Sequence, residues 1–179
     1  MVSKIQGKAL NLVGYRLNLG VCRALRQYLE NLKNALTRIV LDNNGIASGD
    51  VLSELLQGIA SQDDFKSIII IKNTVDEASA SILIEMLKRP FPKNLEELRI
   101  VNCKISPVST HKLLQAVSES QLKKLSLSGA QINEAGLDLL SGMLAHLRSL
   151  MDLDISWNGL RPNSHLKKFL EALGANRTL

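Results

Sequence analysis

The sequence predicts a single α/β solenoid, with a curved parallel β-sheet on its concave face and α-helices on its convex face. Three observations predict this fold. A motif of spaced apolar residues recurs, and its copies start at residues 36, 65, 95, 122 and 150, so successive starts are 29, 30, 27 and 28 residues apart. The apolar residues alternate within each copy, and a stretch of helical period follows it. A fixed period of this size is typical of repeat architectures, in which each unit packs against its neighbours.

The five copies follow the pattern Leu-x-x-Ile-x-Leu-x-x-Asn-x-Ile, with other apolar residues at some apolar positions and Cys or Ala for Asn in two copies, over residues 36–46, 65–75, 95–105, 122–132 and 150–160. A weaker copy over 10–17 precedes them by the same interval. In Leu98-Arg99-Ile100 the apolar side chains alternate with a polar one, which predicts a short strand that is buried on one face.

Five amphipathic stretches follow these strands, at 50–60, 76–87, 107–117, 134–147 and 164–173. Their apolar residues recur with a helical period, so each predicts a helix that covers the sheet. Asp76 and Asn133 are predicted N-caps, and Pro107 suits a first helical turn.

The position three residues after each strand is predicted to turn inward. Asn44, Asn73 and Asn158 can there bond backbone groups that the turn leaves unpaired, and so form a ladder along the array. Cys103 holds this position in the third copy and can serve in part through its thiol. Ala130 in the fourth copy cannot, so we expect a looser or water-filled turn.

The spacing of these copies resembles the leucine-rich repeat, and the repeat length with a helical second half resembles its ribonuclease-inhibitor-like class. The resemblance implies residues 1–35 as a degenerate repeat with a basic, cap-like helix and residues 36–179 as five repeats. Residues 176–179 resemble the opening of a sixth repeat, so we expect a fragment of a longer array, or a partner or second copy that covers an open C-terminal edge.

Composition favours a cytoplasmic protein. Apolar residues make up 45% of the chain, but no run approaches the roughly 18 needed to span a bilayer, and residues 1–8 lack the apolar segment of a secretion signal. The two cysteines fit a reducing compartment: Cys103 belongs to the ladder, and Cys22 shares a helical face with Leu25 and Leu29, so both are predicted core thiols.

The net charge of +5 is concentrated in residues 1–38, which hold seven Lys/Arg and one acidic residue. A basic end can meet an acidic partner, or it can be a solvated cap whose long side chains lie over apolar surface. Aromatic residues make up only 3% of the chain, which makes nucleic acid an unlikely partner because few rings are present to stack on bases.

The side chains between the buried residues of each strand should line the concave face. They predict an apolar cluster with cations around it, a polar end, and a tryptophan where the last strand meets its loop. These candidate binding residues are Val40, Ile69, Ile71, Lys72, Arg99, Val101, Lys124, Asp154 and Trp157. Exposed apolar clusters mark contact surfaces, although parallel strands favour Ile and Val on either face. Trp157 is either a binding anchor or packs over a neighbouring loop.

The sequence predicts no catalytic residues, no metal site and no cofactor. His111, His146 and His165 fall in three different predicted outer helices, without grouped cysteines or carboxylates. We therefore expect a non-enzymatic scaffold that binds one or more protein partners through the concave face and adjacent loops. The resemblance leaves two alternatives, a regulator of a small GTPase and a sensor fragment of a larger protein.

Overall fold

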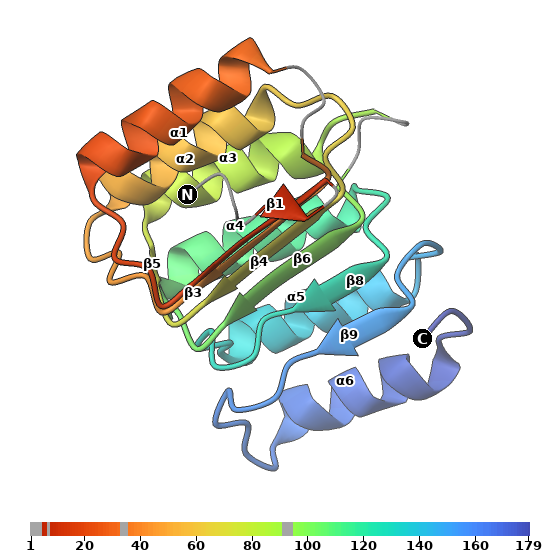
Figure 1. The fold of residues 1–179 in the computed structure, drawn as a ribbon. Coiled ribbons are helices and arrows are strands. Elements are labelled where there is room, and N and C mark those ends of the chain that lie inside the picture. The colour runs from red at the N-terminus through yellow and green to blue at the C-terminus, as the bar shows by residue number, and fades with distance from the viewer. Residues whose placement is uncertain (1–4, 7, 33–35, 91–94) are drawn as a thin grey trace.

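A computed structural model of the chain describes residues 5–6, 8–32, 36–90 and 95–179 (Figure 1). Its main feature is a seven-stranded sheet in the order β1-β2-β3-β4-β6-β8-β9. The strands are β1 (Ile5–Gln6), β2 (Ala9–Val13), β3 (Arg38–Asp42), β4 (Ser67–Ile71), β6 (Glu97–Val101), β8 (Lys124–Ser126) and β9 (Asp152–Asp154). Strands β2 to β9 are parallel to their neighbours, whereas β1 pairs with β2 antiparallel.

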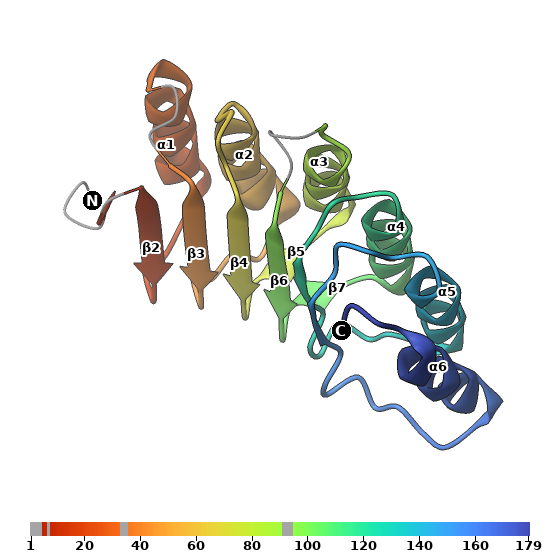
Figure 2. The ribbon, with the colours of Figure 1, turned by 90° about the vertical axis from the view of Figure 1, so that its right-hand side faces the viewer.

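Six helices in the described part of the chain cover one face of this sheet. They are α1 (Leu19–Asn31), α2 (Gly49–Ala60), α3 (Glu77–Leu87), α4 (Pro107–Ser118), α5 (Glu134–Leu144) and α6 (Ser164–Ala175). Figure 2 shows the helices along the outer side of an arc and the strands along its inner side. The predicted alternation of strand and helix, with a parallel sheet, is thus confirmed.

The strand register aligns residues that hold equal positions in the sequence repeats. Ile39 pairs with Ile68, Ile68 with Leu98, Leu98 with Leu125, and Leu125 with Leu153. Because every step shifts by one whole repeat, each strand presents the same face to the helices. Strand register therefore follows directly from the repeat.

The core lies between sheet and helices. Ile68 and Ile70 in β4 are fully buried, and Leu52, Leu55 and Ile59 of α2 are equally inaccessible on the helical side. Burying such a side chain contributes about 1.5–3 kcal/mol, so the stacked core positions supply most of the stability.

Helix starts follow the predicted caps. The side chain of Asp76 accepts the N–H of Ser79, and that of Asn133 accepts the N–H of Gly136. Pro107 is the first residue of α4, where its missing N–H costs nothing. The helix predicted over 134–147 ends earlier, at Leu144.

The two ends of the sheet differ. At the C-terminal end Leu153, Ile155 and Leu160 are only partly buried, because β9 is an edge strand with no further unit beside it. At the N-terminal end Arg26 forms ion pairs with Glu30 and Glu54, which offsets part of the basic excess of the first unit. Lys4 and Lys33, which contribute to that excess, lie outside the described residues.

A short second sheet, β5 (Thr74–Val75) paired with β7 (Lys104–Ile105), joins the loops that leave β4 and β6. In the described part of the chain, no helix is long and apolar enough to cross a bilayer.

Candidate interaction surface

The centre of the concave sheet face is less exposed than the sequence predicts. Ile69 retains only 7% of its accessible surface, and Val40, Ile71 and Val101 are half-buried. The expectation of an exposed Ile69 is therefore wrong. Val40 and Arg99 pair with Ile69 in register on either side, about 4.8 Å away, and cover it.

A network of charged side chains crosses this face. Glu97 accepts Arg38 Nη1 at 2.8 Å, Ser67 Oγ at 2.5 Å and Arg99 Nε at 2.7 Å. Arg99 Nη2 then reaches Asp152 Oδ2 at 2.9 Å, passing over β8. The predicted concave cation Arg99 is thus held between two carboxylates rather than free.

Glu97 is the centre of this network. Partial burial opposes its ionisation, but hydrogen bonds from Ser67 and Arg99, and the charges of Arg38 and Arg99, outweigh burial and lower the pKa of Glu97 below its ordinary value of 4.5. The carboxylate is therefore ionised at neutral pH, and its bonds fix the two guanidinium groups.

The polar end of the face is similarly organised. Asp154 accepts Ser126 Oγ at 2.8 Å and the N–H of Ser156 at 3.0 Å. Burial again opposes ionisation, but these bonds and the charge of Arg99 lower the pKa of Asp154. Lys124 is exposed, and its side chain has no ion-pair partner in the part of the chain that the structure describes.

The predicted turn residues lie inward and contact the backbone of neighbouring units. Asn73 donates to the carbonyls of Ile71 at 2.9 Å and Leu41 at 3.3 Å, and its Oδ1 accepts the N–H groups of Asn44 at 3.1 Å and Ile46 at 3.4 Å. A single side chain therefore pairs four groups in two successive turns.

The ladder positions Asn44, Asn158 and Cys103 make similar bonds to neighbouring backbone, but Cys103 makes weaker ones. Asn44 donates to the carbonyls of Leu12 and Tyr15, both at 2.9 Å, and Asn158 donates to that of Leu127 at 2.8 Å. Cys103 makes longer contacts, 3.4 Å to the Ile70 carbonyl and 3.5 Å to that of Val101.

The turn at Ala130 does not look loose. Ala130 is fully buried, and its carbonyl accepts Thr110 Oγ1 at 3.1 Å. Ala130 is therefore packed, but this hydroxyl bonds the Ala130 carbonyl and does not replace the side-chain ladder bonds that Asn73 makes in its own turn.

Burial also settles the state of the two thiols. Desolvation, with a smaller contribution from Glu54, raises the pKa of Cys22 to about 11. Desolvation likewise raises the pKa of Cys103. Both thiols are buried, unpaired and protonated at neutral pH, which makes them poor nucleophiles.

Left-handed residues mark the edge where each parallel strand ends. Asn43, Lys72, Asn102 and Trp157 have φ between 50° and 58° at equivalent positions of their units, and Gly14 and Gly129 hold this position in two other units. We call the loops that begin at these residues the loop edge. Lys72 is exposed there, and 85% of the surface of Trp157 is accessible, so Trp157 does not pack over a neighbouring loop.

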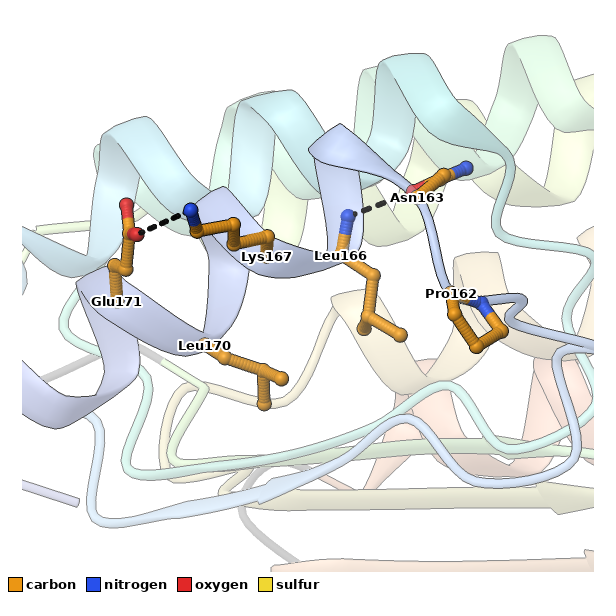
Figure 3. Close-up of a pocket in the computed structure, with 6 residues that line it drawn as sticks. All are labelled: Pro162, Asn163, Leu166, Lys167, Leu170 and Glu171. Carbon is orange, nitrogen blue, oxygen red and sulfur yellow. Dashed lines mark hydrogen bonds and ion pairs between the residues drawn. The ribbon is translucent and has the colours of Figure 1, made fainter.

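A shallow apolar groove runs along α6 at the C-terminal end of the array. Pro162, Leu166 and Leu170 line it together with Asn163, Lys167 and Glu171 (Figure 3). Leu170 is 55% exposed. The Lys167–Glu171 ion pair, at 3.9 Å, leaves the rim without net charge.

His111 lies in α4 and His165 in α6, whereas His146 follows the end of α5. The His165 ring forms a hydrogen bond with Asp138 at 2.9 Å. This bond is the main cause that lowers the pKa of Asp138, and the charge of His165 contributes less. Within the described residues, no three His, Cys, Asp or Glu side chains are grouped to hold a metal ion.

Sequence reasoning overlooked two exposed cations at the loop edge, Arg16 and Lys104. A signal was present, because Arg16 lies 29 residues before Gly45, and the structure pairs Thr74, the next equivalent position, with Lys104. Because the loop positions repeat as the strand positions do, Arg16 and Lys104 hold equivalent positions along the loop edge.

Comparison with known proteins identifies solved structures that share this fold. No protein-family model matches the chain, and no curated protein sequence matches it. Among solved structures, the C-terminal domain of tropomodulin from Caenorhabditis elegans matches with a TM-score of 0.60 and 14% identity, over 86% of this chain and 91% of that one. Actin-binding site 2 of leiomodin-1 matches with a TM-score of 0.63 and 14% identity, over 84% and 86%.

These matches overturn the assignment to the ribonuclease-inhibitor-like class. A period of 27–30 residues fixes the alternation of strand and helix, but it does not fix the class within such arrays. At 14% identity the likeness concerns the fold alone. The chain therefore shares the mixed α/β fold of the tropomodulin and leiomodin domains.

Proposed function

We propose that this chain is a non-enzymatic solenoid of the leucine-rich-repeat type that binds a protein partner through its concave face and loop edge. The observation that carries the proposal is Trp157, which combines a left-handed backbone, at φ 58°, with 85% exposure. A left-handed conformation costs a residue other than glycine about 1–2 kcal/mol.

Packing of the Trp157 side chain within the folded chain does not offset this backbone strain. Gly14 and Gly129 hold the equivalent positions in two other units, with φ of 70° and 67°, so a glycine suits the backbone. A large aromatic side chain that is strained and solvated adds nothing to folding stability, which favours a contact role.

Around Trp157 the proposed contact surface includes the accessible part of the concave face. Its further members are Val40, Ile71, Lys72, Arg99, Val101, Lys124 and Asp154. Of these residues, Arg99 is held by Glu97 and Asp152, so its side chain loses little conformational entropy when a partner docks.

We propose actin as the partner and the cytoplasm as the compartment. The support is the leiomodin-1 domain, named actin-binding site 2, which shares the fold over most of both chains. Neither matched name concerns a GTPase, so the alternative of a GTPase regulator is not carried forward.

A non-enzymatic role is supported by the chemistry of the thiols. Cys22 and Cys103 are buried and protonated, and each donates or packs inside a turn or helix rather than lining a cleft.

Co-sedimentation with filamentous actin tests this proposal, with Trp157→Gly as the variant. The substitution removes the aromatic side chain and relieves the backbone, while glycine's larger unfolded-state entropy offsets about 0.5–1 kcal/mol of that gain, so stability should change by about 1 kcal/mol or less. We expect at least a tenfold loss of actin affinity with unchanged circular dichroism.

Leu170→Ala is the matched control, because it trims an exposed apolar side chain within α6, outside the concave face and the loops. Normal binding by this variant and weak binding by Trp157→Gly support the proposal. The reverse pattern would move the contact to the α6 groove, and absence of binding by the wild-type chain would exclude actin.

A further inference from the structure

A row of cations without partners lies along the loop edge. Arg16, Lys72 and Lys104 are exposed, and in the described part of the chain none of their side chains has an ion pair or hydrogen bond. Most other described lysines are neutralised; Lys112 pairs with Glu77 at 2.8 Å, and Lys123 with Glu96 at 2.8 Å. Arg16, Lys72 and Lys104 differ from these paired lysines in that all three are free and lie along one edge.

The fold brings these three side chains together from separate loops. Thr74 and Lys104 pair in the short parallel ladder β5–β7, and Lys72 precedes Thr74 by two residues. Arg16 lies over the next loop, with its Cγ 3.9 Å from the position that a Cβ on Gly45 would take. The row thus follows the stacking direction of the repeats.

A hollow of about 300 Å³ lies beside two of these cations, Lys72 and Lys104, which both line it. Gly45 and Ala47 also line it, and Arg16 lies next to Gly45. The small size of Gly45 and Ala47 leaves the hollow open to a bound segment.

The nearby acidic groups do not cancel this charge. Asp76 caps α3 through Ser79, and Glu77 is held by Lys112 on the helix layer. The N-termini of α2, α3 and α4 follow the same loops, and the positive ends of their helix dipoles add to the field of the cations. The side chains of Asp42 and Asp50, near the edge, have no ion pair or hydrogen bond in the described part of the chain, and the three cations outnumber them.

We propose that this basic row binds an acidic segment of the protein partner, whose carboxylates pair with Lys72, Lys104 and Arg16. The inference rests on the proposed function, since it specifies the chemistry of the partner and the edge that meets it. Carboxylates are chosen by charge complementarity with free cations around an open hollow.

The position of Trp157 adds a second requirement. Trp157 and Lys72 hold the same place in their units, three strands apart, which corresponds to about 15 Å at the spacing of adjacent strands. An extended peptide covers this distance with about five residues. The matching segment therefore carries carboxylates and, about five residues away, an apolar side chain for Trp157.

An NMR titration with two synthetic peptides tests this inference. One peptide carries four Asp/Glu residues followed after a short spacer by a leucine, and the other has Asn/Gln at the same positions. At low ionic strength, where surface charges are least screened, we expect the acidic peptide to shift the amide signals of residues 45–47, 72–74 and 102–104, and the amide peptide to leave them unchanged.

The variant Lys72→Glu/Lys104→Glu should bind the acidic peptide at least tenfold more weakly. Lys167→Glu/Lys168→Glu on α6 changes the net charge equally, at positions exposed by 80% and 63%, and should bind as the wild type does. Equal binding by the two double variants, or equal binding of the two peptides, would overturn the inference. Binding to phosphatidylserine vesicles but not to the acidic peptide would also overturn it.

The same variants in actin co-sedimentation separate this inference from the proposed function. Actin binding that Trp157→Gly weakens and Lys72→Glu/Lys104→Glu preserves would keep the proposed function and overturn the acidic segment. Charge-selective peptide binding without any actin binding would keep the basic row and exclude actin as the partner.

Discussion

Replacing Asn73 with alanine removes one side chain that pairs with two turns at once. Its Oδ1 accepts the N–H groups of Asn44 and Ile46, which are buried at 0% and 3% exposure, and its amide donates to the Leu41 carbonyl. Ile71 keeps a second bond, because its carbonyl also accepts the Asn43 N–H. The Leu41 carbonyl likewise lies within the β3–β4 ladder, so the groups left without a partner are the two N–H groups and the buried Asn44 Oδ1, to which the Asn73 amide donates at 3.3 Å.

Leaving a buried group unpaired costs about 1–3 kcal/mol. Taking the lower end for each group, because a small side chain admits some water, the loss in unfolding free energy is about 3 kcal/mol. For a chain of 179 residues, this corresponds to a fall in melting temperature of about 6–12 °C.

Urea unfolding followed by circular dichroism measures this loss, with Cys103→Ala as the comparison. The Cys103 thiol is a weak hydrogen-bonding group, and its contacts with the Ile70 and Val101 carbonyls are long, at 3.4 and 3.5 Å, so its replacement should cost about 1 kcal/mol. Equal costs at the two positions, or a loss below 1 kcal/mol for Asn73→Ala, would refute the view that the asparagine side chain supports the turns.

The remaining predictions concern the core, the charge network and the helices. Ile70→Ala leaves a cavity between sheet and helices and should cost about 4 kcal/mol, whereas Ile69→Ala on the concave side can be filled by solvent and should cost about 1–2 kcal/mol; equal losses in urea unfolding would contradict the assigned faces. Since the folded-state pKa of Glu97 is lowered, its contribution to stability is complete above its ordinary pKa of 4.5 and is lost as pH falls through the folded value. Thermal unfolding of Glu97→Gln should therefore depend less on pH below 4.5 than that of the wild type, and parallel profiles would argue against the network. Gly142→Ala should stabilise α5 by about 0.5–1 kcal/mol because a Cβ meets no atom within 4 Å, whereas Gly58→Ala should destabilise because a Cβ would lie 2.8 Å from Arg26 Cα; melting temperatures that move in the same direction would contradict this contrast.

The repeated positions were predictable from the sequence because they depend on local periodicity. The alternation in Leu98-Arg99-Ile100 predicted both the strand and its buried face, and the observed register follows from the repeat. Asp76 and Asn133 were recognisable as caps because capping needs only a short polar side chain before an apolar run.

Features that depend on neighbouring units were not predictable. The burial of Ile69 depends on the side chains of the strands on both sides, and the bond from Thr110 to the Ala130 turn depends on the packing of α4. The two-residue strands β1, β5 and β7 are too short to carry a period of their own.

The candidate surface shows the same division. Trp157 was identified because its type and its place after a strand are visible in the sequence. Its left-handed backbone could not be predicted from the residue type, because the five left-handed residues other than glycine in the described chain include Asn, Lys, Gln and Trp.

Two ion pairs on the concave face connect units that are not adjacent. Arg38 in β3 reaches Glu97 in β6 across β4, and Arg99 in β6 reaches Asp152 in β9 across β8. Stacked arrays are commonly treated as chains in which only adjacent units interact, so that terminal units can unravel one at a time. Although a surface ion pair contributes about 1 kcal/mol or less, these pairs extend coupling to second neighbours. The last described strand is thereby tied to the middle of the sheet, and loss of β9 should weaken β6 as well as β8, which lengthens the cooperative segment of the array.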